Sequence, residues 1–319
     1  MVALLLLPFV QRLVAGPTPL HVIEAPTAGS GKSLLVNLLA VLATGEPANA
    51  RALPTGDDEV RKMITSELVT GRSLFVIDNV DNRRPLDSAS LASVLTATSW
   101  TDRVLGFTRM VTVPNRSVWV LTANNPRISM EITRRCVRIR IDPCMDRPWL
   151  RGGFRHTALL TWALEHRAAL VHAALTLVQH WVANERPRAN ARLGSFERWS
   201  ETMGGILETS AVPGFLGNLH ALYETADAEG AMWRELVEAW WSEYQQKAVR
   251  VAELAKFCAS NDLLASVLGD GSEKAQQIRL GRALQNARDR MFGHYRIEAV
   301  KDAHTKRPVY RLVRVEVAQ

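Results

Sequence analysis

The sequence EAPTAGSGKSLL, residues 24–35, matches a phosphate-binding loop at every position except one. It follows an apolar run and precedes a helical pattern, which is the context such a loop requires. Pro26 stands where the pattern G-x-x-x-x-G-K-[ST] has its first glycine, in the entry turn, and proline fits there if the local φ is near its fixed value. Backbone amides and a helix N-terminus still surround the phosphate position. The loop therefore predicts nucleotide binding by Thr27, Ala28, Gly29, Ser30, Gly31, Lys32 and Ser33.

Short apolar runs alternate with helical patterns through the first 145 residues. The expected strands are LHVIEA (20–25), SLFVIDNV (73–80), SVWVLTANN (117–125), CVRIRID (136–142) and a short run near RALP (51–54). The expected helices cover residues 31–45, 57–71 and 86–99. This alternation predicts an α/β fold in which a parallel sheet is covered by helices.

The pattern changes after Pro148. Residues 156–183 show long helical periodicity, and further helices are expected from about residue 196 to 241. The end of the chain predicts a helix at 251–260, a basic helix at 275–292 and two strands at 294–300 and 307–315. We therefore expect a P-loop core (1–148), a helical lid or linker (149–245) and a C-terminal winged-helix domain that binds DNA (246–319).

Bulk composition is that of a folded protein with a basic surface. The 319 residues are 47% hydrophobic and 22% charged, with a net charge of +7, so a polyanion is a plausible partner. Cys136, Cys144 and Cys258 lack CxxC spacing, which favours reduced thiols in a cytoplasmic protein and suggests no metal site. The opening MVALLLLPFVQRLV has no basic start and is too short to span a bilayer, so we expect a helix beside the first strand and no membrane contact.

Several residues can carry phosphate chemistry. Lys32 would reach the β- and γ-phosphates, while Ser33 and Asp78, at the end of an apolar strand, would hold Mg²⁺. A turn aspartate after a buried strand is the alternative for Asp78. Asn79 stands where many ATPases with a phosphate loop have a catalytic glutamate. An asparagine can orient water but cannot accept its proton. Glu24 or Asp81 could supply a carboxylate instead.

The amides Asn124 and Asn125 end the next strand, where one of them could polarise the attacking water. An Asx-turn before Pro126 is the structural alternative. Arg134 and Arg135 precede the following strand, and one of them could act as an arginine finger toward a neighbouring subunit's nucleotide.

In this order, the motifs resemble the AAA+ ATPase module, and more narrowly the superfamily 3-like helicase portion of phage and plasmid primase-helicases. The resemblance covers nearly the whole chain and is carried by PTAGSGKSLL, VIDNVD, LASVLTATSWTDRVLG, LTANN, TRRCVRIRID and GSFERWSETMGGILETSAVPGFLGN. The last of these is the most specific to the subgroup.

The resemblance implies ATP and Mg²⁺ as cofactors, with Lys32, Ser33 and Asp78 at the phosphates and metal. It implies Asn124 or Asn125 as sensor 1 and Arg134 or Arg135 as finger. It also implies a ring, expected to be a homo-hexamer, and a primase supplied by a separate protein or an upstream segment. Asn79 departs from the family pattern and puts hydrolysis in doubt more than binding.

Two segments are candidates for DNA contact. TDRVLGFTRMVTVP (101–114) could form a hairpin that places Arg103 and Arg109 against single-stranded DNA in a central pore, although a solvated surface hairpin is the alternative. From Gln276 onward ten basic residues face four acidic ones, so most of the excess charge lies there, although a solvated helix face would also explain it. The residues suited to duplex phosphates and base edges are Gln277, Arg279, Arg282, Asn286 and Arg288.

These features predict an ATP-driven, ring-forming DNA helicase or translocase of a phage- or plasmid-type replication system. A second hypothesis is an ATP-binding scaffold or initiator that assembles on DNA with little hydrolysis, which Asn79 supports. A third is a DNA-packaging or partner-loading ATPase.

Overall fold

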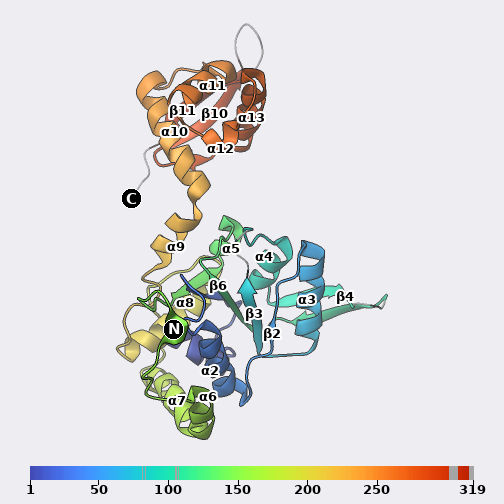
Figure 1. Cartoon of the computed structure of the whole chain (residues 1–319), viewed down its shortest axis with the longest axis vertical. Helices are drawn as coiled ribbons and strands as arrows, with labels where there is room; N and C mark the ends of the chain where they lie inside the picture. The colour runs from blue at the N-terminus through green and yellow to red at the C-terminus, as the bar shows by residue number, and fades with distance from the viewer. Residues whose placement is uncertain (81, 83, 105, 107, 302–307, 316–319) are drawn as a thin grey trace. The chain divides into compact units, whose positions relative to one another are not determined.

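The computed structural model describes residues 1–80, 82, 84–104, 106, 108–301 and 308–315 (Figure 1). The chain divides into two compact units, Met1–Ala226 and Asp227–Gln319, each described here by itself. The predicted division at residues 148 and 245 stays a prediction. Among helices of the described ranges, none has the length and apolarity needed to cross a bilayer.

The first unit is built on a five-stranded parallel sheet. Its strands are β1 (Leu20–Ala25), β2 (Ala50–Arg51), β3 (Leu74–Val80), β6 (Val118–Asn124) and β7 (Cys136–Arg140), in the order β2-β3-β6-β1-β7. The strands expected at 20–25, 73–80, 117–125 and 136–142 are confirmed, with β1 at the predicted bounds, and β2 overlaps the short run expected near 51–54 at Arg51. β1 is buried along its whole length, as expected for a strand covered on both faces.

Helices surround this sheet. They are α1 (Val2–Val10), α2 (Lys32–Thr44), α3 (Asp57–Val69), α4 (Ala89–Thr96), α5 (Met130–Thr133), η1 (Pro148–Leu150), α6 (Leu159–Glu165), α7 (Arg167–Ala183), α8 (Glu197–Thr209) and α9 (Leu219–Ala226). The predicted helix at 86–99 is shorter at both ends. Ser88 caps α4 through its side chain, and Ala97 is already extended before the next strand.

Alternate residues of the strands enter two separate cores. Ile23, Val76 and Val120 pack with α1, α2, α7 and α8, so the predicted N-terminal helix shares a core with the first strand. Val22 and Ile77 pack on the opposite face with α3, α4 and α5. The period of two along each strand thus produces the three-layer arrangement of helices, sheet and helices.

A close backbone approach fixes α8 against the segment that follows α7. A Cβ atom at Gly205 would lie 2.0 Å from the carbonyl oxygen of Pro187, so only glycine fits there. The same carbonyl accepts a 2.8 Å hydrogen bond from Trp181 Nε1. The Gly204-Gly205 pair therefore has a packing role within the GSFERWSETMGGILETSAVPGFLGN segment.

An antiparallel hairpin, β4 (Ser99–Arg103) and β5 (Met110–Pro114), confirms the hairpin expected at 101–114. A buried carboxylate attaches its base to α3. Asp102 accepts hydrogen bonds from Arg61 Nη1 (2.6 Å) and Thr65 Oγ1 (2.5 Å), and Thr65 accepts one from Trp100 Nε1 (2.9 Å). Burial raises the pKa of Asp102, but the hydrogen bonds and the Arg61 charge outweigh it and lower the pKa. The hairpin is thus tied to the core by charged and polar contacts.

The second unit has its own core. Its elements are α10 (Ala228–Tyr244), β8 (Val249–Arg250), α11 (Val251–Ser260), α12 (Ala265–Leu268), α13 (Glu273–Asn286), β9 (Met291–Phe292), β10 (Tyr295–Lys301) and β11 (Pro308–Arg314). The strands form an antiparallel sheet in the order β8-β11-β10-β9. Trp233 and Trp240 of α10 lie in this core with Leu280 and Leu284 of α13.

The basic helix is shorter than predicted. α13 ends at Asn286, and Asp289 takes a left-handed backbone (φ 63°) that redirects the chain. Met291 and Phe292 then pair with β10 as a strand, so the prediction of a helix to residue 292 is wrong. Arg288 consequently lies outside the helix. The winged-helix assignment stays a prediction.

His21 of β1 is a buried ring between the sheet and α8. Its centroid lies 5.7 Å from that of Trp199. Burial lowers the pKa of His21 to about 4. The folded protein therefore holds this imidazole neutral well below its ordinary pKa.

We predict that acid weakens this unit through His21. Between pH 6.5 and 4, His21 is protonated in the unfolded chain and neutral in the folded protein. The free energy of unfolding therefore falls as the pH is lowered, by roughly 3 kcal/mol at pH 4. His21→Leu removes this contribution. Denaturant unfolding at pH 7, 5.5 and 4.5 measures it, and equal pH slopes for the two proteins would contradict the prediction.

Candidate functional site

The phosphate loop connects β1 to α2 and has the backbone expected of a phosphate cradle. Gly29 and Gly31 have φ of 72° and 90°, which favour glycine, and Lys32 begins α2. Ser30 Oγ donates to the carbonyl oxygen of Thr27 (2.6 Å), which closes the loop on itself. Pro26 sits before these positions, at the entry to the loop.

Lys32 joins the loop to β6. Its Nζ donates to Asn124 Oδ1 (2.6 Å) and makes a longer contact with the carbonyl oxygen of Thr27 (3.4 Å). The residue is buried, and burial lowers the pKa of the ammonium, opposed by the charge of Asp78. These contacts hold a cation between the phosphate loop and the end of β6.

Ser33 joins the same loop to β3. Its Oγ lies 3.4 Å from Asp78 Oδ1. Neighbouring oxygen ligands of octahedral Mg²⁺ lie about 2.9 Å apart, given metal–oxygen distances of 2.0–2.1 Å, so this pair is close to a suitable spacing. Mg²⁺ commonly takes only one or two protein oxygens and completes its shell with phosphate and water. The two residues fit the ion in this way.

Thr122 positions Asp78, and sequence reasoning missed it. Its Oγ1 donates a short hydrogen bond to Asp78 Oδ1 and accepts one from the backbone N–H of Asn79 (2.9 Å). Thr122 and Asn124 are two residues apart on β6 and so share a face, one holding Asp78 and the other Lys32. The alternation in LTANN is the signal that could have identified it.

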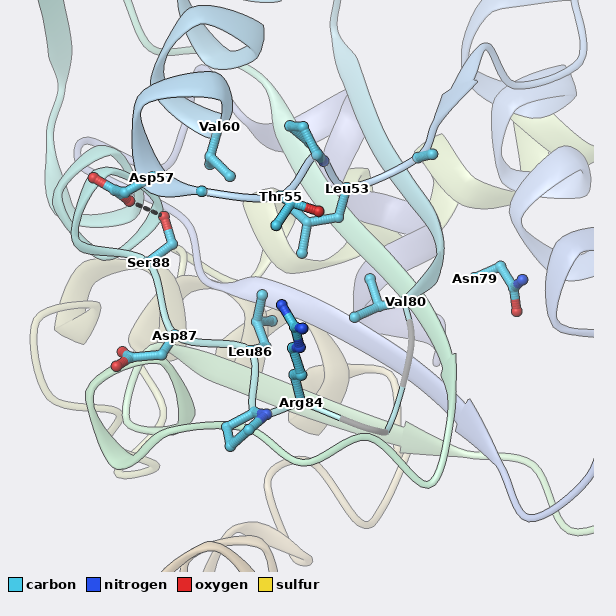
Figure 2. Close-up of a pocket in the computed structure, with 14 residues that line it drawn as sticks. Leu53, Thr55, Asp57, Val60, Asn79, Val80, Arg84, Leu86, Asp87 and Ser88 are labelled. Atoms are coloured by element: carbon cyan, nitrogen blue, oxygen red, sulfur yellow. Dashed lines mark hydrogen bonds between the residues drawn. The ribbon is translucent and has the colours of Figure 1, made fainter.

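Asn79 lies at an irregularity of β3, where the register against β6 shifts between Ile77 and Val80. Its backbone is left-handed (φ 53°), a conformation that asparagine tolerates better than most residues. Its side chain is exposed and lines a cleft of about 720 Å³ with residues of the β2–α3 and β3–α4 connections (Figure 2). Figure 2 shows the Arg84 side chain pointing into this cleft toward the loop that carries Leu53 and Thr55.

Glu24, one of the two residues that could supply a carboxylate in place of Asn79, is part of an ion-pair cluster. Glu24 is buried at the end of β1, where its Oε1 lies 2.7 Å from Arg140 Nη1 and 3.1 Å from Arg138 Nε. Arg140 also donates to Asn125 Oδ1 (3.1 Å). Asn125 therefore contacts this ion-pair cluster, whereas Asn124 contacts Lys32. Asp81 lies outside the described residues.

The arginine pair is split by burial. Arg135 is buried and donates to the carbonyl oxygen of Glu131 (2.6 Å). The Arg134 side chain is 49% exposed and makes two hydrogen bonds to the Glu131 carboxylate (2.7 and 2.9 Å). Those bonds and the arginine charges hold the pKa of Glu131 below its usual value. Of the two, Arg134 is the one that solvent, or another chain, can reach.

The predicted DNA contacts lie in three places. Arg103 and Arg109 are exposed on the hairpin, and Arg282 and Asn286 are exposed on α13. Gln277 is half-buried. Arg279 donates to the carbonyl oxygens of Leu268 (2.6 Å) and Asp270 (2.8 Å), so its guanidinium braces the loop before α13. Arg288 lies 3.3 Å from Asp289. Their DNA contacts stay predictions.

Comparisons with known proteins identify no family. No family model matches the chain, and no curated protein matches it. Among solved structures, the apo NrS-1 C-terminal region is 16% identical over 99% of this chain and 75% of that one, with a TM-score of 0.44. The JCV helicase is 16% identical over 71% and 63%, with a TM-score of 0.29.

We predict that the backbone at residue 79 penalises the acidic residue that a hydrolytic site would use. Asn79→Glu places a residue with little tolerance of positive φ there and lowers the free energy of unfolding by about 1 kcal/mol. Asn79→Gly, the matched control, adopts the same backbone without that cost. Denaturant unfolding compares the three proteins, and equal stability of the Glu and Gly variants would contradict the prediction.

Proposed function

We propose that this chain is an ATPase that works as a ring-forming DNA translocase or helicase. The observation that carries the proposal is the convergence of three parallel strands on the phosphate loop. Lys32 contacts Asn124 at 2.6 Å and Ser33 approaches Asp78 at 3.4 Å. A cation, a hydroxyl, a carboxylate and an amide thus surround one point at the carboxyl edge of the sheet, which is where ligands of such sheets bind.

In this proposal each group has a distinct task. The loop amides and Lys32 bind the phosphate oxygens, and Lys32 exchanges its contact with Asn124 for one with phosphate. The freed Asn124 amide orients the attacking water. Ser33 and Asp78 hold Mg²⁺, which supplies charge neutralisation at the phosphates. Thr122 fixes the carboxylate of Asp78. Positioning and electrostatics supply most of the catalysis in such reactions, so no strong base is essential.

Assembly and DNA contact complete the proposal. Arg134 is our choice for a finger that reaches the next subunit's nucleotide, because Arg135 is buried. A homo-hexamer would bring such a residue to every site. Arg103 and Arg109 of the hairpin would follow a single strand, and α13 would bind duplex DNA. A primase is the expected functional partner.

A second candidate function is an ATP-switched DNA-binding scaffold with little hydrolysis. The left-handed backbone at Asn79 favours it, because the position suits asparagine and not the glutamate of an efficient hydrolase. The scaffold would bind a fluorescent ATP analogue and DNA without releasing phosphate, whereas the motor would release it.

We predict that Lys32→Ala abolishes DNA-stimulated phosphate release and weakens ATP binding at least tenfold, because the buried cation above the loop is lost. Lys62→Ala is the control, since Lys62 lies on α3 with a side chain that is 41% exposed and pairs with Glu59. Phosphate release with and without single-stranded DNA provides the measurement. Normal turnover in Lys32→Ala would refute the assignment.

We also predict complementation between subunits. Arg134→Ala and Lys32→Ala should each be inactive alone, but an equal mixture should regain about a quarter of wild-type activity, because random assembly joins an intact loop to an intact arginine at one interface in four. Arg127 is an exposed arginine in the connection between β6 and α5. Arg127→Ala is therefore the matched control and should stay active. An inactive mixture would argue against a finger acting between subunits.

A further inference from the structure

The short turn η1, which follows β7, lies directly against the phosphate loop. A Cβ atom at Gly29 would stand 3.0 Å from Trp149 Cβ and 3.3 Å from its backbone nitrogen. Pro148, the first residue of η1, is buried. A side chain at residue 29 would therefore collide with Trp149.

The Trp149 side chain is nevertheless open to solvent. It is 59% exposed, and no aromatic ring of the described residues stacks on it. Tryptophan is usually well buried, and Trp100, Trp119, Trp181 and Trp199 of the same unit are buried, while Trp162 is half-buried. An exposed indole beside a phosphate cradle provides a flat apolar surface.

The sheet order indicates which end of a nucleotide would meet this surface. β1 lies between β6 and β7. Asp78 and Asn124, the groups for the metal and the terminal phosphate, come from β3 and β6 on one side. η1 follows β7 on the other side. A triphosphate that places its terminal phosphate beside Asn124 would direct its nucleoside toward η1.

We propose that Trp149 is the stacking platform for the base of the bound nucleotide. The inference rests on the proposed function, because it requires phosphate in the loop. Stacking uses the π-face and not the base edge, so it recognises purine nucleoside triphosphates as a class and distinguishes ATP from GTP only weakly. The larger purine ring overlaps the indole better than a pyrimidine does.

The experiment compares ATP with inorganic tripolyphosphate, which has the phosphates and no base. Binding of each with Mg²⁺ is measured by calorimetry for wild type, Trp149→Ala, Trp149→Phe and the neighbouring Leu150→Ala, which removes another exposed apolar side chain. We expect Trp149→Ala to weaken ATP binding about tenfold or more and to leave tripolyphosphate binding unchanged. Trp149→Phe and Leu150→Ala should stay within about threefold of wild type, since Phe retains an aromatic face.

The contrary outcomes are distinguishable. An equal loss for ATP and tripolyphosphate in Trp149→Ala would mean that Trp149 only supports the loop, and would overturn the inference. Unchanged ATP binding in Trp149→Ala would also overturn it and leave the proposed function standing. A wild-type protein that binds neither ligand, or whose tripolyphosphate binding is insensitive to Lys32→Ala, would overturn the proposed function and this inference with it.

Discussion

The hydrogen bond between Lys32 and Asn124 is the interaction on which the site depends. It joins the first turn of α2 to the end of β6 across the carboxyl edge of the sheet. A buried ammonium requires a polar partner, because desolvation without one is costly. Asn124 supplies that partner as a neutral amide. A neutral partner releases a lysine to phosphate more readily than a carboxylate would, so this contact both stabilises the loop and leaves its charge available.

Asp78 and Asn79 show how one strand end serves two surfaces. Thr122 holds Asp78 beside Ser33 through a hydrogen bond from its hydroxyl. The same hydroxyl accepts a hydrogen bond from the backbone N–H of Asn79. The register against β6 shifts between Ile77 and Val80, and the Asn79 side chain is exposed and lines the cleft. Because the backbone at residue 79 is left-handed, that position selects asparagine or glycine over residues with longer side chains. The sequence departure at residue 79 thus has a backbone reason that is independent of catalysis.

Local pattern was sufficient for the sheet and insufficient for the contacts between its strands. Continuous apolar runs predicted the three central strands, β1, β3 and β6, because both faces of these strands are covered. The end of the basic helix was missed, since the left-handed turn at Asp289 depends on pairing between Phe292 and Tyr295. Thr122 and Trp149 were missed because their partners, Asp78 and Gly29, are distant in sequence. Choosing between Asn124 and Asn125 likewise required their contacts with Lys32 and with Arg140, which are distant in sequence.

Glu24 shows why burial matters for assigning roles. Its carboxylate lies between Arg138 and Arg140, so it is an ion-pair partner of β7 and poorly placed as a free base. Removing one member of such a buried set leaves an uncompensated charge, which makes the set primarily structural. Two arginines against one glutamate also leave a net positive charge at the end of β1, where the phosphate loop begins. Lys32 adds a third cation and Asp78 a second carboxylate, so these groups together carry a small net positive charge, which favours a polyphosphate.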